Sequence, residues 1–185
     1  MLMICLTSVN DIRTDSQLLD ECIHAMAAGE SSGLETLYRE AGPAVFAFAL
    51  SVLKNRQDAE DVLQDCFVNA YGGAAGYRSH GKPMAWLLTI ARNLCMQKLR
   101  ERKRTSDIPE EDWERYLESL ERVTPEDRIV LAECMRTLTD EERQIVVLHA
   151  VGGFKHREIA ELIGLSLPTV LSKYSRAVKK LRKHL

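Results

Sequence analysis

The sequence lacks any hydrophobic run long enough to cross a membrane. No stretch of its 185 residues approaches the roughly 18 to 20 apolar positions that a transmembrane helix needs. The apolar start at residues 1–6 is too short for a signal peptide, and it has neither a basic beginning nor a clear cleavage site. We therefore expect a cytoplasmic protein without membrane insertion.

Paired cysteines and catalytic motifs are also missing. The five cysteines are odd in number and form no Cys-x-x-Cys pair. We interpret Cys66 and Cys95 as core thiols, because both fall within apolar helical stripes. Cys22 and His24 are two possible metal ligands, but two ligands do not make a site. Without a nucleophile elbow, a phosphate-binding loop or an HExxH motif, we expect no enzyme, no cofactor and no metal.

Long β-branched runs are absent, whereas Leu, Ala, Glu, Arg and Lys are frequent, and this composition favours helix. Apolar residues recur with helical spacing, which predicts an all-α fold. Capping boxes that begin at Thr14, Ser32 and Thr139 mark helix starts, and Thr124-Pro125 marks a further one. A Gly-rich loop is expected at 72–82. The predicted helices are 15–29, 33–53, 57–71, 83–103, 125–137, 140–151, 156–163 and 167–183.

The net charge of −2 conceals three blocks of charge. Residues 98–104 carry a net charge of +4, residues 105–127 a net charge of −7, and residues 151–185 a net charge of +6. Each block alone also fits a solvated helix face, but their order suggests two polyanion-binding surfaces on an acidic tether. We expect two small helical domains, at 15–103 and 125–185, joined by an acidic linker at 104–124.

A helix-turn-helix lies between His156 and Ser175. Gly164 can adopt a positive φ at the turn, Ser166 can cap the second helix, and Pro168 is tolerated in its first turn. Such a helix enters the major groove by its N-terminal part, and lysines further along meet phosphates. An ordinary helical hairpin is the alternative. The side chains expected to face inward are Ile159, Ala160, Ile163, Val170, Tyr174, Ala177 and Leu181. Those expected to face outward on the second helix include Leu167, Pro168, Leu171, Ser172, Lys173, Arg176 and Lys180.

The N-terminal unit combines an acidic helix with a basic one. The helix at 57–71 has an apolar stripe, but its other side is acidic, so DNA would be repelled and solvent or a basic protein must cover it. The following helix becomes basic toward its C-terminal end. Trp86 would be a core residue in most proteins, but here it lies beside the Gly-rich loop and a basic helix end. Single-strand sites combine such a positive groove with stacking of bases.

Together these residues resemble bacterial sigma factors of the sigma-seventy family, in their extracytoplasmic-function (ECF) class. Asp58-Ala59-Glu60-Asp61 with Gln64 and Phe67, and Trp86-Leu87 with Ile90-Ala91-Arg92-Asn93 and Leu99-Arg100, resemble region two. Glu158-Ile159-Ala160, Thr169-Val170, Ser172 and Arg176-Ala177 resemble region four. The chain departs from the pattern at Lys173, where Arg is frequent, at Leu171, where a basic residue is frequent, and at its doubled Gly152-Gly153.

The resemblance implies a protein that binds core RNA polymerase and promoter DNA, directs promoter-specific initiation, opens the strands at the minus-ten element and is held inactive by an anti-sigma factor. It assigns polymerase binding to Asp58, Glu60, Asp61, Gln64 and Asp65. It assigns the minus-ten element to Tyr77, Arg78, Trp86, Arg92, Asn93, Lys98, Arg100 and Arg104. It assigns the minus-thirty-five element to Lys155, His156, Pro168, Thr169, Leu171, Ser172, Lys173, Arg176 and Lys180. A repressor that uses only the C-terminal unit, with residues 1–100 as a sensor or dimerisation domain, is the alternative.

Overall fold

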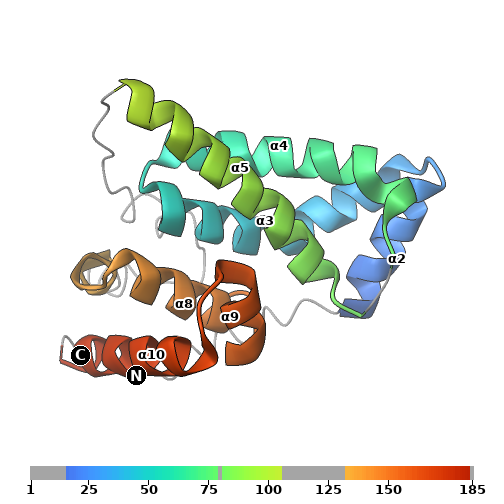
Figure 1. Ribbon diagram of the computed structural model, residues 1–185. Helices are drawn as coiled ribbons and strands as arrows, with labels where there is room; N and C mark the ends of the chain where they lie inside the picture. Colours follow the sequence, from blue (N-terminus) through green and yellow to red (C-terminus); the bar gives the residue numbers. More distant parts are fainter. Residues whose placement is uncertain (1–15, 79–80, 106–131, 184–185) are drawn as a thin grey trace. The chain divides into compact units, whose positions relative to one another are not determined.

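The part of the chain that the structure describes is helical. The computed structural model describes residues 16–78, 81–105 and 132–183, without the side chains of residues 102–105. All regular elements in these ranges are helices and none is a strand, which confirms the predicted all-α class (Figure 1). They include α2 (Ser16–Ala27), α3 (Ser31–Leu53), α4 (Arg56–Gly73), the short 3-10 helix η2 (Ala74–Gly76), α5 (Pro83–Thr105), α8 (Asp140–Ala150), α9 (His156–Ile163) and α10 (Leu167–Leu181).

The described residues form two compact units. Residues 16–49 and 57–105 belong to the first unit, and residues 50–56 and 132–183 belong to the second. Each predicted helix that lies wholly in the described ranges begins and ends within two residues of its predicted bounds. The predicted helix 125–137 is described from residue 132 onward, and residues 132–137 are helical. The helix starts expected at Thr14 and Thr124 lie outside the described residues, as does most of the expected linker.

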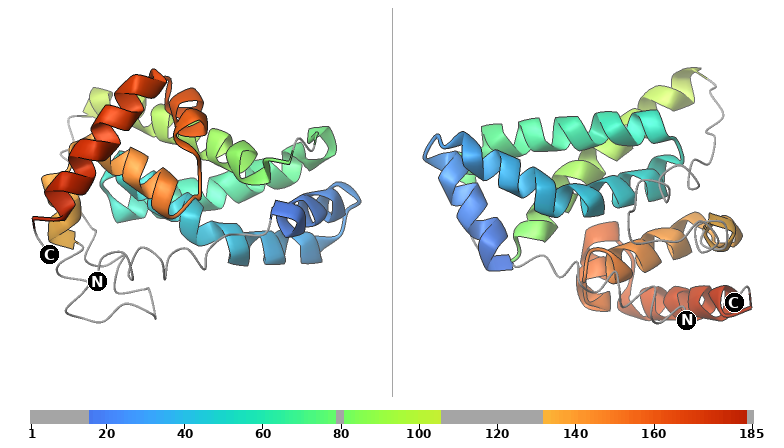
Figure 2. Two further views of the ribbon diagram at one scale, coloured as in Figure 1. Left: turned by 90° about the horizontal axis from the view of Figure 1, so that it is seen from below. Right: turned by 180° about the vertical axis from the view of Figure 1, so that it is seen from behind.

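In the first unit, α2 packs against α5 and η2. Figures 1 and 2 show α2 across one end of α3 and α4. The helix buries Leu19, Cys22, Ile23 and Met26, which recur at the spacing of one helix face. On α4 and α5, Cys66 and Cys95 are fully buried free thiols, and burial raises the pKa of each to about 12. Their predicted role as core residues is confirmed.

The turn between α2 and α3 corrects one predicted cap. A capping box was expected to start the helix at Ser32, but α3 begins at Ser31, so Ser32 lies inside its first turn. Gly29 has a φ of +87° and the Glu30 N–H donates to the Ala25 carbonyl at 3.0 Å, so the chain reverses tightly and α3 starts early. A Cβ on Gly33 would lie 2.6 Å from the Cys22 carbonyl oxygen, so only glycine permits this close approach of α2 and α3.

The prediction of a Gly-rich loop at 72–82 is wrong for the first half of this segment. Helix α4 continues to Gly73, and η2 follows directly at Ala74–Gly76. Ala74 is buried, and the Tyr77 N–H donates to the Ala74 carbonyl at 3.1 Å. Packing of η2 against α2 therefore overrides the low helix propensity of the glycines. Helix α5, which follows the loop, ends at Thr105, two residues beyond the predicted end at 103.

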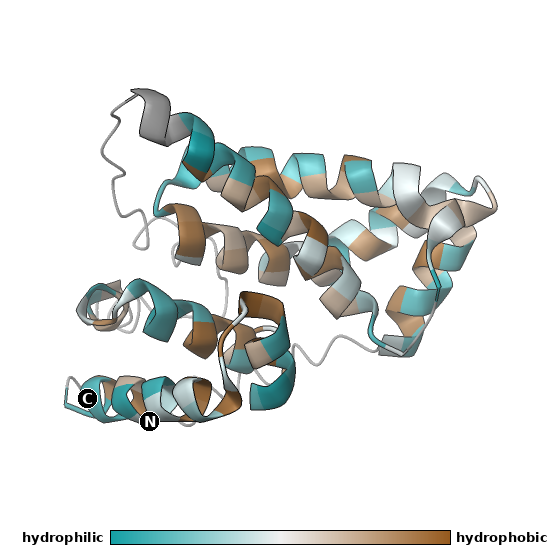
Figure 3. Cartoon of the chain, in the orientation of Figure 1, coloured by the Kyte–Doolittle hydropathy of each residue, from teal (hydrophilic) through white to brown (hydrophobic). Residues whose placement is uncertain are grey.

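In the second unit, α10 packs against α8 and α9. Thr139 forms the predicted capping box: the Glu142 N–H donates to Thr139 Oγ1 at 3.4 Å, and the Thr139 N–H donates to Glu142 Oε2 at 3.0 Å. Figure 3 shows hydrophobic residues along α3 of the first unit, and hydrophilic and hydrophobic residues in alternation along α10. The core of the second unit includes Cys134, Leu138, Val146, Ala177 and Leu181, with Met135 and Tyr174 packed against it.

Within the described residues, no helix is both long enough and apolar enough to pass through a lipid bilayer. No three His, Cys, Asp or Glu side chains in these ranges come together as metal ligands, and Cys22 is a buried free thiol.

Candidate DNA-binding and protein-binding surfaces

The turn between α9 and α10 has the geometry that the sequence predicts. Gly164 adopts a φ of +73°, and its N–H donates to the Ala160 carbonyl at 3.0 Å, which ends α9. Ser166 caps α10, because its Oγ accepts from the Thr169 N–H at 3.4 Å. Pro168 occupies the first turn of α10. The helix-turn-helix is therefore built by local signals that are visible in the sequence.

The inner face of this motif also follows the prediction. Val170, Ala177 and Leu181 of α10 are buried, and Tyr174 is half-buried against the core cluster. On α9 the predicted apolar face is present, with Ile159 and Ala160 buried and Ile163 half-buried.

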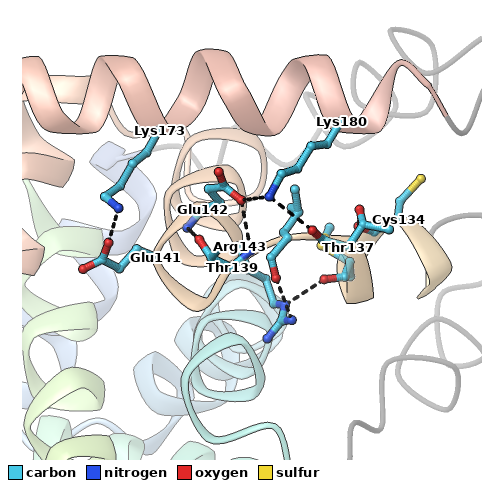
Figure 4. Close-up of polar contacts among 10 residues, drawn as sticks. Cys134, Thr137, Thr139, Glu141, Glu142, Arg143, Lys173 and Lys180 are labelled. Atoms are coloured by element: carbon cyan, nitrogen blue, oxygen red, sulfur yellow. Dashed lines mark hydrogen bonds and ion pairs between the residues drawn. The ribbon is translucent and has the colours of Figure 1, made fainter.

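The second unit also contains a buried arginine, Arg143, that was not expected from the sequence. Only 1% of Arg143 is exposed. Its Nε donates to the Met135 carbonyl at 3.0 Å and its Nη2 donates to the Leu138 carbonyl at 3.2 Å (Figure 4). These two carbonyls lie at the end of the helical residues 132–137, so Arg143 joins that helix to α8. No local pattern distinguishes this arginine from an exposed one.

Two lysines of α10 face α8, which corrects their predicted outward orientation. Lys180 Nζ lies 2.6 Å from Glu142 Oε2 and 3.3 Å from the Thr137 carbonyl (Figure 4). Lys173 forms an ion pair with Glu141. Burial alone would raise the pKa of Glu142, but the hydrogen bonds from Lys180 and Thr139 lower it below its usual value. The lysines are drawn inward because α8 begins with acidic residues that face α10.

The exposed side of α10 is a continuous line of side chains opposite Val170, Ala177 and Leu181. We call it the outer stripe of α10. Four of its members were expected from the sequence. Ser175 and Lys179 were not, although the spacing of the buried residues could have identified both. Leu171 is 47% exposed, which is unusual for so large an apolar side chain in this structure. The outer stripe consists of Pro168, Leu171, Ser172, Ser175, Arg176 and Lys179.

Thr169 and His156, two other residues expected to contact DNA, already interact with residues of their own unit. The Thr169 hydroxyl lies 2.7 Å from the Ser166 hydroxyl. The His156 ring stacks on His149 at 4.6 Å between centroids and meets Tyr174 edge-on at 4.6 Å. Burial, and then the neighbouring His149, lower the pKa of His156 below its usual 6.5. Lys155, at the start of α9, is exposed as expected.

The acidic side of α4 is only partly exposed to solvent. Asp61, Gln64 and Asp65 are exposed, whereas Asp58 and Glu60 are half-buried. Lys98 of α5 lies 2.7 Å from Asp61 and 3.5 Å from Asp58. Burial alone would lower the pKa of Lys98, but the two carboxylates raise it above its usual value. One residue expected on DNA thus pairs with two expected on polymerase.

Tyr77 and Trp86 pack together beside α2. Their ring centroids lie 4.8 Å apart, and the Tyr77 hydroxyl donates to Asp20. Both rings are half-buried, so each retains some accessible surface. Gly73 adjoins the indole, since a Cβ there would lie 3.6 Å from Trp86 Cζ2. The sequence placed these two aromatics near the same loop, and the structure brings them into contact.

The remaining residues assigned to the minus-ten element are spread along the loop and α5. Arg78, Asn93 and Arg100 are exposed, and Arg92 is half-buried. Arg104 is helical, but its side chain lies outside the part that the structure describes. Among the described side chains of α5, Arg100 is an exposed cation, whereas Lys98 turns toward α4.

Comparison with known families assigns both units. Residues 37–105 match Sigma-70 region 2, and residues 128–181 match Sigma-70, region 4. The first match covers α4, η2, α5 and most of α3, and the second covers α8, α9 and α10.

Curated relatives and solved structures agree with these matches. The chain is 28% identical over 169 residues to the ECF RNA polymerase sigma factor SigM of Mycobacterium tuberculosis, covering 91% of this chain and 83% of SigM. It is 24% identical over 171 residues to SigK of Mycobacterium ulcerans, covering 89% and 91% of the two chains. Its fold is similar to that of the sigma factor RpoE in complex with the anti-sigma factor NepR from Bartonella quintana, with a TM-score of 0.66, 24% identity and coverage of 81% and 94%. It is also similar to CnrH in complex with the cytosolic domain of CnrY, with a TM-score of 0.58, 24% identity and coverage of 92% and 96%.

Proposed function

Because the chain belongs to the sigma-70 family, in its ECF class, and directs promoter-specific transcription initiation, we propose which of its surfaces bind core RNA polymerase and which bind promoter DNA. The observation that carries the proposal is the presence of both matched regions, in this order, on one chain. The protein then acts in the cytoplasm as a dissociable polymerase subunit without catalytic activity of its own. Its domains are residues 15–103 and 125–185, and the acidic residues 104–124 link them.

The outer stripe of α10 reads the minus-thirty-five element. Its N-terminal part presents small and apolar side chains to base edges, and Arg176 offers a planar fork that can donate two hydrogen bonds to a guanine. Lys179 and Lys155 are exposed cations placed for phosphates. Lys173 and Lys180 contribute mainly by holding α10 on α8, since their ammonium groups already pair with Glu141 and Glu142.

The exposed acids of α4 dock on core polymerase. Gln64 and Asp65 lie on the same side of α4 as Asp61, one turn further along the helix. An exposed acidic face repels DNA and attracts a basic protein surface. Asp58 and Asp61 are partly neutralised by Lys98, so the net negative charge available to a partner lies toward Asp65.

The Tyr77–Trp86 pair forms one wall of the single-strand site for the minus-ten element. Extruding a base from the duplex costs a few kcal/mol, and contact with aromatic side chains recovers part of that cost. Arg78, Asn93 and Arg100 are exposed near this pair and along α5, where they can meet the backbone of the non-template strand. Arg92, which is half-buried on α5, and Arg104 are further candidates for such contacts.

An anti-sigma factor is the expected regulatory partner. The RpoE structure with a similar fold was solved in complex with the anti-sigma factor NepR. A protein that covers the acidic side of α4 would block binding to polymerase. One that covers the outer stripe of α10 would block binding to DNA.

Run-off transcription with the full-length protein, purified core polymerase and a random promoter library tests the proposal. We expect initiation from a defined subset of promoters only when both protein and core are present. The protein alone should bind duplex DNA weakly. Strong binding to a symmetric operator as a dimer, with no gain in initiation over core alone, would instead indicate a repressor.

A further inference from the structure

The first half of the outer stripe of α10 offers no exposed charge. Residues 167–175 contain one charged side chain, Lys173, and it pairs with Glu141 of α8. The Thr169 hydroxyl is engaged by the Ser166 hydroxyl at 2.7 Å. What remains exposed toward the groove is Pro168, Leu171, Ser172 and Ser175.

Leu171 is an exposed large apolar side chain in that half of the helix. Its side chain is 47% exposed, and it lies about one and a half turns before Arg176 and about two turns before Lys179. A single exposed leucine on an arbitrary surface needs no explanation. Here, however, it lies on the part of a helix-turn-helix that enters the major groove, between side chains that suit bases and phosphates.

The major groove offers one apolar feature to such a side chain. Thymine carries a C5-methyl group there, whereas the edges of adenine, guanine and cytosine present hydrogen-bonding groups. Building on the function proposed above, we propose that Leu171 packs against the C5-methyl group of a thymine in the minus-thirty-five element, and that this contact sets the base preference at that position. The neighbouring serine hydroxyls can adapt to either donors or acceptors, so they do not enforce a competing preference.

The pairing of Lys173 with Glu141 makes this arrangement possible. A lysine that projected into the groove beside Leu171 would favour the acceptors of guanine and would compete with a methyl contact. Because its ammonium group is held by α8, Leu171 is the side chain that approaches the bases in the first two turns of α10.

Removing a single methyl group from the DNA tests the proposal. A promoter recovered from the run-off library is synthesised with deoxyuridine in place of each thymine of its minus-thirty-five element, one position at a time. The full-length protein bound to core polymerase should lose about fourfold in affinity at one position, the factor that corresponds to burial of one methyl group. The Leu171→Ala variant should show the lower affinity already on the unmodified promoter and no further loss with deoxyuridine.

Two variants separate this contact from general effects. Leu171→Met keeps a flexible apolar side chain and should retain the loss with deoxyuridine. Lys179→Ala, on the same stripe, should weaken all duplexes alike and keep the same loss. The proposal is overturned if deoxyuridine has no effect at any position with the wild-type protein, or if Leu171→Ala retains the full effect. Failure of the wild-type protein to initiate on any unmodified promoter would contradict the proposed function itself, and this is a separate reading in the same assay.

Discussion

The ammonium group of Lys98 on α5 lies 2.7 Å from the Asp61 carboxylate on α4, across 37 positions of sequence. It also lies 3.5 Å from Asp58, so one lysine holds two carboxylates of the acidic helix. The pair places a basic residue of the proposed DNA edge and an acidic residue of the proposed polymerase surface in one cluster. Lys98 therefore serves mainly to join α5 to α4.

Replacing Lys98 with Ala should lower the free energy of unfolding by up to about 1 kcal/mol, because the pair is only partly shielded from water. Urea denaturation followed by tryptophan fluorescence measures this. The difference from wild type should shrink at about 1 M salt, where charges are screened within about 3 Å. Arg100→Ala removes an exposed cation from the same helix and is the matched control. If Lys98→Ala and Arg100→Ala were equally stable at low salt, the structural role given to Lys98 would be wrong.

Asp65→Arg should weaken binding to core polymerase without destabilising the protein, since Asp65 is exposed on α4. Asp61 is a poorer site for this test because its replacement also breaks the pair with Lys98. Titration of labelled protein with core polymerase gives the affinity. Glu35→Arg makes the same change of charge at an exposed position of α3 and should bind core normally. If both variants bind core as tightly as wild type does, the acidic side of α4 is not the docking surface.

The helices were predictable because their signals are local. The capping box at Thr139, the positive φ of Gly164 and the Ser166 cap all act within a few residues, and each is present as the sequence indicates. Where the prediction failed, a tertiary contact prevailed over propensity: burial of Ala74 turned half of an expected loop into helix.

The orientation of charged side chains was less predictable than the helices. Lys180 and Glu142 are 38 positions apart, and the spacing of α10 does not identify Glu142 as the partner of Lys180. Arg143 is likewise indistinguishable by sequence from the exposed Arg136. Long-range pairs of this kind decide which cations remain for DNA, so the sequence predicted the surface but not all of its members.

Arg143→Met should destabilise the second unit by about 1–3 kcal/mol, because the part-buried carbonyl of Met135 and the buried carbonyl of Leu138 lose their donors. Arg143→Lys should recover little of this, since a single ammonium group lacks the planar fork that reaches both carbonyls. Urea denaturation followed by far-ultraviolet circular dichroism gives the free energies. Arg136→Met, at an exposed position, is the control. Full recovery by lysine would mean that charge alone matters at this position.

The His156 ring is packed between His149 and Tyr174, which makes the second unit sensitive to acid. Its pKa is lowered by burial and by His149, so the fold favours the neutral ring. The unfolded chain binds this proton near the usual pKa of 6.5, at a higher pH than the folded protein does. The stabilisation is therefore complete above pH 6.5 and is lost as the pH falls toward the lowered pKa.

We expect the urea midpoint of the second unit to fall as the pH is lowered from 7.5 to about 5.5, and the fall to be smaller in His156→Phe, which keeps the ring but cannot be protonated. Hydrogen exchange in α9 and α10, corrected for intrinsic rates, follows this unit separately from the first. His24→Gln removes a histidine that is exposed in the first unit and should leave the dependence on pH unchanged. A midpoint that falls equally in His156→Phe and in the wild-type protein would show that His156 does not govern the response.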